Sequence, residues 1–193
     1  MPLPDRSLLP DEKVAQLAVL FREAGIPHAF GGAIALVYWS EPRGTVGIDI
    51  NVFLATAEVP RVFAALNRHG VATTPDQEAE AIKREQVRLD WAGTPIDLFF
   101  AYDPFHDSCS ERSVDVDFYG PPIRVLSAED IVIFKALYDR PKDWPDIEQL
   151  LAVQGPELDA GYVRDWIGRM LAVEDSARTR LETLLGQYGD PPP

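Results

Sequence analysis

Two short stretches decide the fold of this chain: Gly-Gly-Ala at residues 31–33 and Arg-Gly-Thr-Val-Gly-Ile-Asp-Ile-Asn-Val-Phe at residues 43–53. The residues around them predict a strand, a glycine turn, a helix and a second strand that carries a carboxylate, Asp49, on one face. A glycine turn that opens a helix leaves backbone N–H groups unpaired at the positive end of the helix dipole, which favours a phosphate group. A carboxylate on the next strand is the type of ligand that a phosphate-bound divalent metal takes. Together the two stretches indicate nucleotide chemistry.

The composition is that of an ordinary folded protein with a strong acidic excess. The chain has 193 residues, of which 46% are hydrophobic and 25% charged, and its net charge is −13. A surface that follows a nucleic-acid backbone needs the opposite sign of charge, so the composition disfavours general nucleic-acid binding. An acceptor or ligand that is small or cationic suits this charge better.

The cysteine content, the first residues and the length of the apolar runs indicate where the protein is located in the cell and which metal sites it can form. Cys109 is the single cysteine, so an intramolecular disulfide and a cysteine-rich metal site are excluded. The first residues lack the charged and apolar regions of a signal peptide, and no apolar run reaches the ~20 residues of a membrane span. We therefore expect a cytoplasmic protein with no membrane partner.

Periodicity and turn chemistry predict an α/β (α+β) fold, with a mixed twisted sheet and flanking helices. The predicted domain covers residues 1–154, and residues 155–193 form a C-terminal helical appendage. Strands are expected at 27–30, 48–54, 87–91, 96–102, 113–118 and 123–126, helices at 10–24, 33–39, 59–68, 162–171 and 172–188 and from 127 onward, a helix or loop at 76–85, and a loop at 103–111.

The residues of the two decisive stretches resemble those of the minimal nucleotidyltransferases of the polymerase-beta-like superfamily, especially the AbiEii-type toxin branch. That branch has Gly-Gly, a helix, and then Arg-x-Thr-x-Asp-Ile-Asp at the head of a strand. This chain departs from it at Gly47, where the first acid is expected. It keeps the other characteristic residues, Gly31, Gly32, Arg43, Thr45 and Asp49.

The resemblance implies a reaction, a cofactor and partners. The reaction is transfer of a nucleoside monophosphate from an NTP to a hydroxyl acceptor, with Mg²⁺ or Mn²⁺ as cofactor. A toxin-type role implies a cognate antitoxin or another protein as partner, and RNA as an acceptor that the acidic charge disfavours. Because Gly47 replaces a metal-binding acid, we expect weak activity, and the alternative is a catalytically inactive nucleotide-binding or protein-interaction protein on the same fold.

Side chains alternate along the strand that follows Gly47, so Gly47, Asp49 and Asn51 share one face and the intervening apolar residues face the core. On this face Asp49 is either a metal ligand or a solvated surface acid. Asn51 offers a neutral oxygen, which holds Mg²⁺ less well than a carboxylate does.

Asp97 is an acid within an otherwise apolar strand, and it matches the third acid of the polymerase-beta-like pattern. The resemblance implies that Asp97 is both a metal ligand and the base that takes the proton from the attacking hydroxyl. If so, we expect it on a strand next to that of Asp49, with few hydrogen-bond partners. The alternative is an ion pair with Arg88 across the hairpin.

A second family-like stretch begins at Ser127 and includes Lys135, a lysine surrounded by apolar residues. The matching lysine of AbiEii-type proteins contacts nucleotide phosphates, which implies a catalytic and nucleotide-binding role for Lys135 with Asp143 and Asp146 close by. The alternative is a buried ion pair between Lys135 and either acid that orients two helices.

Arg43 and Thr45 complete the predicted nucleotide-binding set with Gly31 and Gly32. They are expected to orient the turn or to contact phosphate. Arg43 is equally suited to an ion pair with Glu41.

Overall fold

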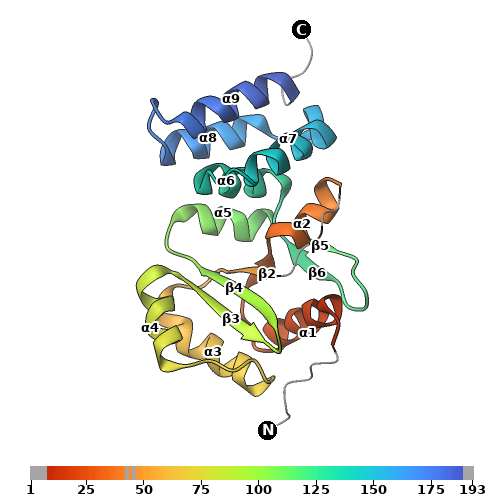
Figure 1. The fold of residues 1–193 in the computed structure, drawn as a ribbon, viewed down its shortest axis with the longest axis vertical. Helices are drawn as coiled ribbons and strands as arrows, with labels where there is room; N and C mark the ends of the chain where they lie inside the picture. Colours follow the sequence, from red (N-terminus) through yellow and green to blue (C-terminus); the bar gives the residue numbers. More distant parts are fainter. Residues whose placement is uncertain (1–7, 42–43, 45–46, 189–193) are drawn as a thin grey trace. The chain divides into compact units, whose positions relative to one another are not determined.

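The structure is a computed structural model that describes residues 8–41, 44 and 47–188 (Figure 1). Two compact units emerge from its contacts, and each is described by itself. The first contains the described residues of Met1–Ile34 and Gly44–Leu126, and the second those of Ala35–Arg43 and Ser127–Pro193. This division falls after Leu126, earlier than the boundary after residue 154 that the sequence indicated.

The first unit contains a mixed six-stranded sheet in the order β3-β4-β2-β1-β6-β5, which confirms the predicted fold class. The pairs β2–β4 and β1–β6 are parallel, and the other neighbouring pairs are antiparallel. The strands are β1 (His28–Phe30), β2 (Ile48–Val52), β3 (Gln86–Trp91), β4 (Thr94–Phe100), β5 (Val114–Val116) and β6 (Ile123–Val125).

Alternation of buried and exposed residues explains why β3 and β4 form a hairpin with one core face. In β3 every second residue is buried, including Val87 and Leu89, and their neighbours are exposed. Ala92 and Gly93 make the two-residue turn between the strands, both at positive φ (49° and 81°), as a type I′ hairpin turn requires. The polar residues of the two strands therefore share the opposite face of the sheet.

The helices of the first unit are α1 (Pro10–Glu23), α3 (Val59–Arg68), α4 (Pro75–Arg84) and α5 (Pro104–Arg112), with a short 3₁₀ turn, η1 (Thr56–Glu58). Helix α1 buries Leu17 and Phe21. From the same helix, the buried Lys13 donates from Nζ to Trp91 O (2.8 Å) and to Thr94 Oγ1 (2.7 Å). A buried ammonium needs such oxygen partners, and these two attach α1 to the turn end of the β3–β4 hairpin.

Helix α5 corrects the sequence analysis, which predicted a loop at residues 103–111. Asp103 is the N-cap, and its Oδ1 accepts a hydrogen bond from Phe105 N (2.8 Å). Phe105 and Cys109, one helical turn apart, are both buried. An aspartate followed by proline is a helix-start signal, and the polar residues between the two apolar ones obscured it.

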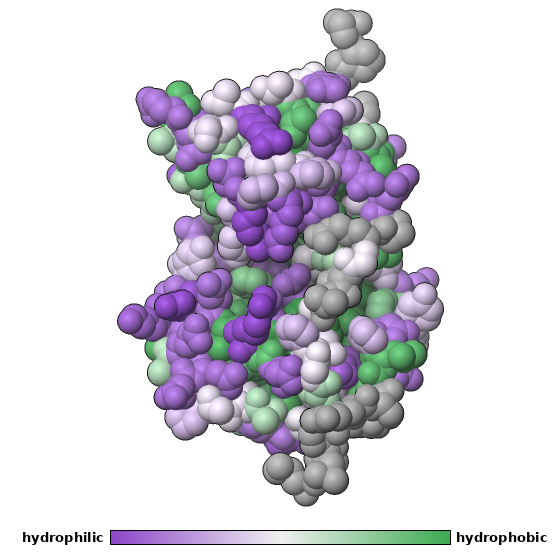
Figure 2. Space-filling model, viewed as in Figure 1, coloured by the Kyte–Doolittle hydropathy of each residue, from purple (hydrophilic) through white to green (hydrophobic). Residues whose placement is uncertain are grey.

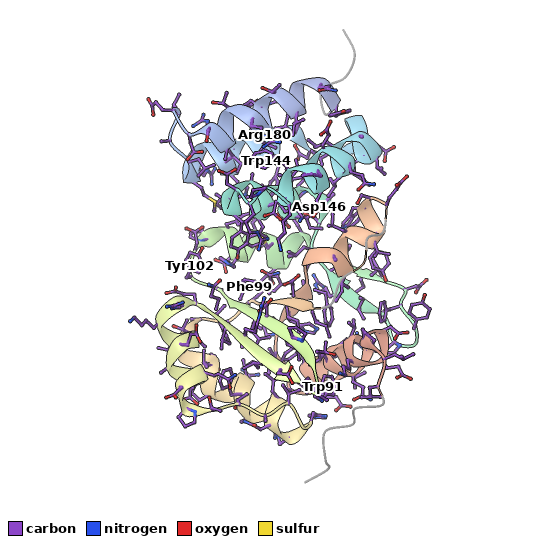
Figure 3. The ribbon with its side chains drawn as sticks, viewed as in Figure 1. Trp91, Phe99, Tyr102, Trp144, Asp146 and Arg180 are labelled. Carbon is purple, nitrogen blue, oxygen red and sulfur yellow. The ribbon has the colours of Figure 1, made fainter. Side chains whose placement is uncertain are left out.

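The second unit is helical: α6 (Ala128–Tyr138), α7 (Asp143–Gln154), η2 (Gly155–Glu157), α8 (Ala160–Met170) and α9 (Ser176–Tyr188). Helix α6 packs against α7, α8 and α9, which is why the division lies before α6. The guanidinium of Arg180 lies over the ring of Trp144 at 4.3 Å, and both residues are labelled in Figure 3. The Nε1 of Trp144 donates to Asp139 Oδ1 at 2.8 Å. The remaining helix, α2 (Gly32–Trp39), begins in the first unit and continues into the second.

Hydrophilic and hydrophobic side chains are interspersed over the face drawn in Figure 2. Within the part of the chain that the structure describes, no helix combines the length and the apolar character needed to cross a bilayer.

Candidate active site

Functional residues on three neighbouring strands of the first unit form a row, and the row continues at Gly31, the residue after β1. Asp49 of β2 and Asp97 of β4 are register partners in a parallel pair, and Arg88 of β3 is the antiparallel partner of Asp97. On the other side of Asp49, Gly31 N donates to Asp49 O (2.9 Å). Register partners on adjacent strands point to the same face, so the side chains of Asp49, Asp97 and Arg88 share one face. We call Asp49 and Asp97 the acid pair.

The glycine turn brings Gly32 into direct contact with Asp49. Gly32 has φ +52°, and a Cβ built there would overlap Asp49 Oδ2 and lie 2.7 Å from Asp49 Cγ. Only glycine fits this position, for its backbone conformation and for the space that the carboxylate takes. The Asp49 carboxylate is thereby fixed at the first residue of α2, where the helix dipole favours negative charge.

Arg88 holds the second acid of the pair. Its Nε and Nη2 donate to Asp97 Oδ1 and Oδ2, each at 2.7 Å. The Arg88 side chain is 71% exposed and that of Asp97 is 20% exposed. The hydrogen bonds to Asp97, then its charge and to a lesser degree the charge of Asp49, raise the pKa of Arg88 above its usual value. The ion pair with Arg88 across the hairpin, the alternative role of Asp97, is therefore present, and the guanidinium occupies both oxygens.

The residues present fit one divalent cation by ligand type. Asp49 and Asp97 supply the anionic oxygens that Mg²⁺ prefers, from neighbouring positions on one face. Among the residues that the structure describes, no group of three or more His, Cys, Asp or Glu side chains could hold a metal. The acid pair is thus a smaller donor set than the family pattern implies, and part of it is bound to Arg88.

Position 47 has room for the acid that this chain lacks. A Cβ on Gly47 would lie 3.5 Å from Pro95 O and 3.8 Å from Pro95 Cβ, which are ordinary contacts. Gly47 precedes β2 by one residue and is two residues from Asp49, so a carboxylate there falls on the face of the acid pair. An aspartate at this position is compatible with the backbone.

Asn51, the third predicted metal ligand, is 5% exposed. A Cβ on Gly31 would lie 2.9 Å from Asn51 Nδ2, so the amide packs closely against the glycine turn. This close approach is a reason for glycine at position 31, and a metal-binding role for Asn51 stays a prediction.

In the second unit, Lys135, Asp143 and Asp146 form what we call the buried cluster, and the exposed Arg140 contacts it from the surface. Lys135 Nζ donates to Asp143 Oδ1 (3.1 Å) and to Asp146 Oδ2 (2.6 Å), and Asp143 also accepts from Arg140. The side chains of Lys135, Asp143 and Asp146 are 7%, 0% and 8% exposed. These contacts are the ion-pair alternative, formed with both acids, and they join α6 to α7. Asp146 is labelled in Figure 3. The role of Lys135 in nucleotide binding stays a prediction.

Burial acts to raise the pKa of Asp143, but the hydrogen bonds from Arg140 and Lys135 outweigh it and hold that pKa below its ordinary value. The carboxylate is therefore ionised at neutral pH, which the two cations require.

Two predicted site residues, Arg43 and Thr45, lie outside the described residues. One residue of the site, Arg88, was named from the sequence only as a structural partner of Asp97. Its position in β3, on the exposed side of an alternating strand opposite Asp97, is the signal that places it in the row.

No protein-family model and no curated protein matches this sequence, but several solved structures resemble its fold. ANT(2'')-Ia in complex with adenylyl-2''-tobramycin is 15% identical, with a TM-score of 0.54 over 89% of this chain and 97% of that one. The lincomycin-bound lincosamide antibiotic adenylyltransferase LnuA is 14% identical, with a TM-score of 0.53 over 75% and 98%. A nucleotidyltransferase-like protein from Paracoccidioides brasiliensis is 16% identical, with a TM-score of 0.53 over 98% and 96%.

The chain has the nucleotidyltransferase fold. At these identities the likeness concerns the fold alone, and it agrees with the superfamily that residues 31–53 resemble.

Proposed function

We propose that this protein is a nucleotidyltransferase that transfers a nucleoside monophosphate from an NTP to a hydroxyl acceptor. The observation that carries the proposal is the in-register acid pair on the sheet face beside the Gly31–Gly32 turn. Two structures with this fold support it, since their names describe an adenylyltransferase and an adenylylated antibiotic.

In the proposed reaction, the acceptor oxygen attacks the α-phosphorus of the NTP. The bond from that phosphorus to the oxygen bridging the β-phosphate breaks, and pyrophosphate leaves. Asp97 takes the proton of the attacking hydroxyl once its oxygens are released from Arg88. Asp49 and Asp97 would hold a bound Mg²⁺ or Mn²⁺, which supplies positive charge to the phosphates.

The N–H of Gly31 already donates to Asp49 O, so the backbone N–H groups suited to a phosphate are those of the first turn of α2, from Gly32 onward. On the family resemblance, Thr45 is assigned to the nucleotide and Asn51 to the metal. Nucleotide-binding roles for Arg43 and Lys135, which belong to the second unit, stay predictions. Asp143 and Asp146 orient Lys135 through the contacts of the buried cluster.

The acceptor is proposed to be a small cationic molecule that carries a hydroxyl group. The net charge of −13 favours a cation and disfavours RNA. The AbiEii-type toxin branch and a cognate antitoxin partner stay predictions from the resemblance of residues 31–53.

The test is transfer from a labelled NTP to a panel of hydroxylated amines with Mg²⁺ or Mn²⁺. We expect slow transfer by the unmodified protein, faster transfer and tighter metal-dependent NTP binding by Gly47→Asp, and none by Asp97→Asn. Fast turnover by the unmodified protein would show that two carboxylates suffice. Unchanged NTP binding in Gly47→Asp, measured by calorimetry, would show that the deficit lies elsewhere.

A second candidate function is nucleotide binding without transfer. It is favoured by Gly47 and by the bidentate contact of Arg88 with Asp97. Saturable NTP binding with no labelled product, in both the unmodified protein and Gly47→Asp, is the result that selects it.

A further inference from the structure

Arg88 gives the acid pair a cation of its own. Its Nε–Nη2 edge donates to both oxygens of Asp97, whose register partner on the next strand is Asp49. A guanidinium matches a carboxylate in charge and in planar geometry. The oxygen positions and the negative charge that a divalent cation would use at Asp97 are thus already engaged.

A ligand in solvent can open the contact between Arg88 and Asp97 because the guanidinium is exposed. The Arg88 side chain is 71% exposed and that of Asp97 is 20% exposed, so water reaches the guanidinium and the pair is easier to open than a buried one. Both hydrogen bonds of the guanidinium to Asp97 come from its Nε–Nη2 edge. The hydrogens of the other edge can therefore be donated to a second acceptor. Most of the Arg88 side chain is exposed, and a phosphate group is an anion of the right geometry for a guanidinium edge.

We propose that Arg88 is a positioning residue that competes with the divalent cation for Asp97. Free metal must displace the guanidinium without providing it a new anion. A metal–nucleoside triphosphate complex provides both a cation for Asp97 and phosphate oxygens for Arg88. The site therefore selects the metal–nucleotide complex over the free metal, an inference that rests on the proposed function for the identity of the ligand.

The experiment measures free Mn²⁺ by electron paramagnetic resonance as Mn²⁺ is added to the folded protein without nucleotide. We expect Arg88→Gln to bind Mn²⁺ about tenfold more tightly than the unmodified protein, because a like charge beside the metal has been removed. The gain should vanish in the Arg88→Gln/Asp97→Asn double variant. Arg84→Gln is the matched control, since Arg84 forms an exposed ion pair with Glu80 at 3.7 Å on α4.

With circular dichroism showing a native fold, Mn²⁺ binding by Arg88→Gln that is no tighter than that of the unmodified protein overturns the proposal. So does a gain that persists in the double variant or appears equally in Arg84→Gln. Arg88→Ala repeats the measurement with no polar group at the end of the side chain, and the same outcomes apply to it.

Nucleotide selection is tested by repeating the titration with ATP present. ATP should tighten Mn²⁺ binding more in the unmodified protein than in Arg88→Gln, and equal tightening contradicts a role for Arg88 toward the phosphates. These measurements need no turnover. If Arg88→Gln binds Mn²⁺ about tenfold more tightly but the transfer assay shows no product, the proposed reaction alone is rejected. If transfer occurs but Mn²⁺ affinity does not rise in Arg88→Gln, only the role of Arg88 is rejected.

Discussion

The two ion-pair regions of the molecule have nearly the same contact distances and opposite surroundings. Arg88 lies 2.7 Å from Asp97 with 71% of its side chain exposed, whereas Lys135 lies 2.6 Å from Asp146 with 7% exposed. Breaking a buried ion pair leaves a charge without water, and an exposed one is replaced by water at little cost. Distance alone therefore does not distinguish a pair that holds the fold from one that a ligand can open.

This difference assigns separate tasks to charges that looked alike in the sequence. The buried cluster joins α6 to α7 within the second unit. The acid pair and Arg88 in the first unit are accessible to solvent and to ligands. Four predictions test this assignment, beginning with the largest expected effect.

Lys135→Met should cost about 3–5 kcal/mol of folding free energy, because Asp146 loses the cation that compensates its burial. Urea unfolding measures the loss. Arg169→Met is the control: its ion pair with Asp165 in the same unit is exposed (59% and 56%), and we expect a loss under about 1 kcal/mol. A stable Lys135→Met variant that fails to bind NTP would instead support the nucleotide-binding role of Lys135.

Gly32→Ala tests whether the glycine turn fixes Asp49. The positive φ costs roughly 1–2 kcal/mol for any L-residue, and the overlap with the Asp49 carboxylate adds about 1–3 kcal/mol of overpacking. Gly93→Ala is the matched control, since Gly93 has φ +81° and nothing within 4 Å of the added Cβ. Thermal unfolding should show a larger loss for Gly32→Ala, and equal losses would mean that Asp49 moves aside freely.

The buried cluster should make stability sensitive to acid. The pKa of Asp143 is lowered in the folded state, so the unfolded chain takes up this proton first as the pH falls. The contribution of Asp143 is present above its unfolded pKa of about 3.9 and is lost as the pH falls through the folded pKa. The stability gap between the unmodified protein and Asp143→Asn, measured by urea unfolding, should narrow below about pH 4. A constant gap would contradict the lowered pKa.

Arg88→Gln should change stability least, by under about 1 kcal/mol, because its partner Asp97 remains within reach of water. Urea unfolding at neutral pH measures the change. A loss comparable to that of Lys135→Met would remove the distinction between the two regions, and Arg88 would then be part of the structural framework.

The local pattern of residues determined much of this protein. The glycine turn, the helix after it and the alternation around Asp49 and Asp97 follow from residue type and spacing, and helix α3 has the predicted bounds at Val59–Arg68. These features depend on neighbours along the chain. The helix at Pro104–Arg112 was missed because its stabilising contacts, made by Phe105 and Cys109, lie in the core.

Only the tertiary structure decided which charges meet. The register of β2 with β4 made Asp49 and Asp97 neighbours. The pairing of Arg88 with Asp97 across the β3–β4 hairpin was one of two roles that the sequence left open for Asp97. The sequence left open whether Lys135 pairs with Asp143 or Asp146, and the packing of α6 on α7 brings it to both. Alternation tells which face a side chain takes. Its partner across the sheet or between helices depends on long-range pairing, which no local pattern encodes.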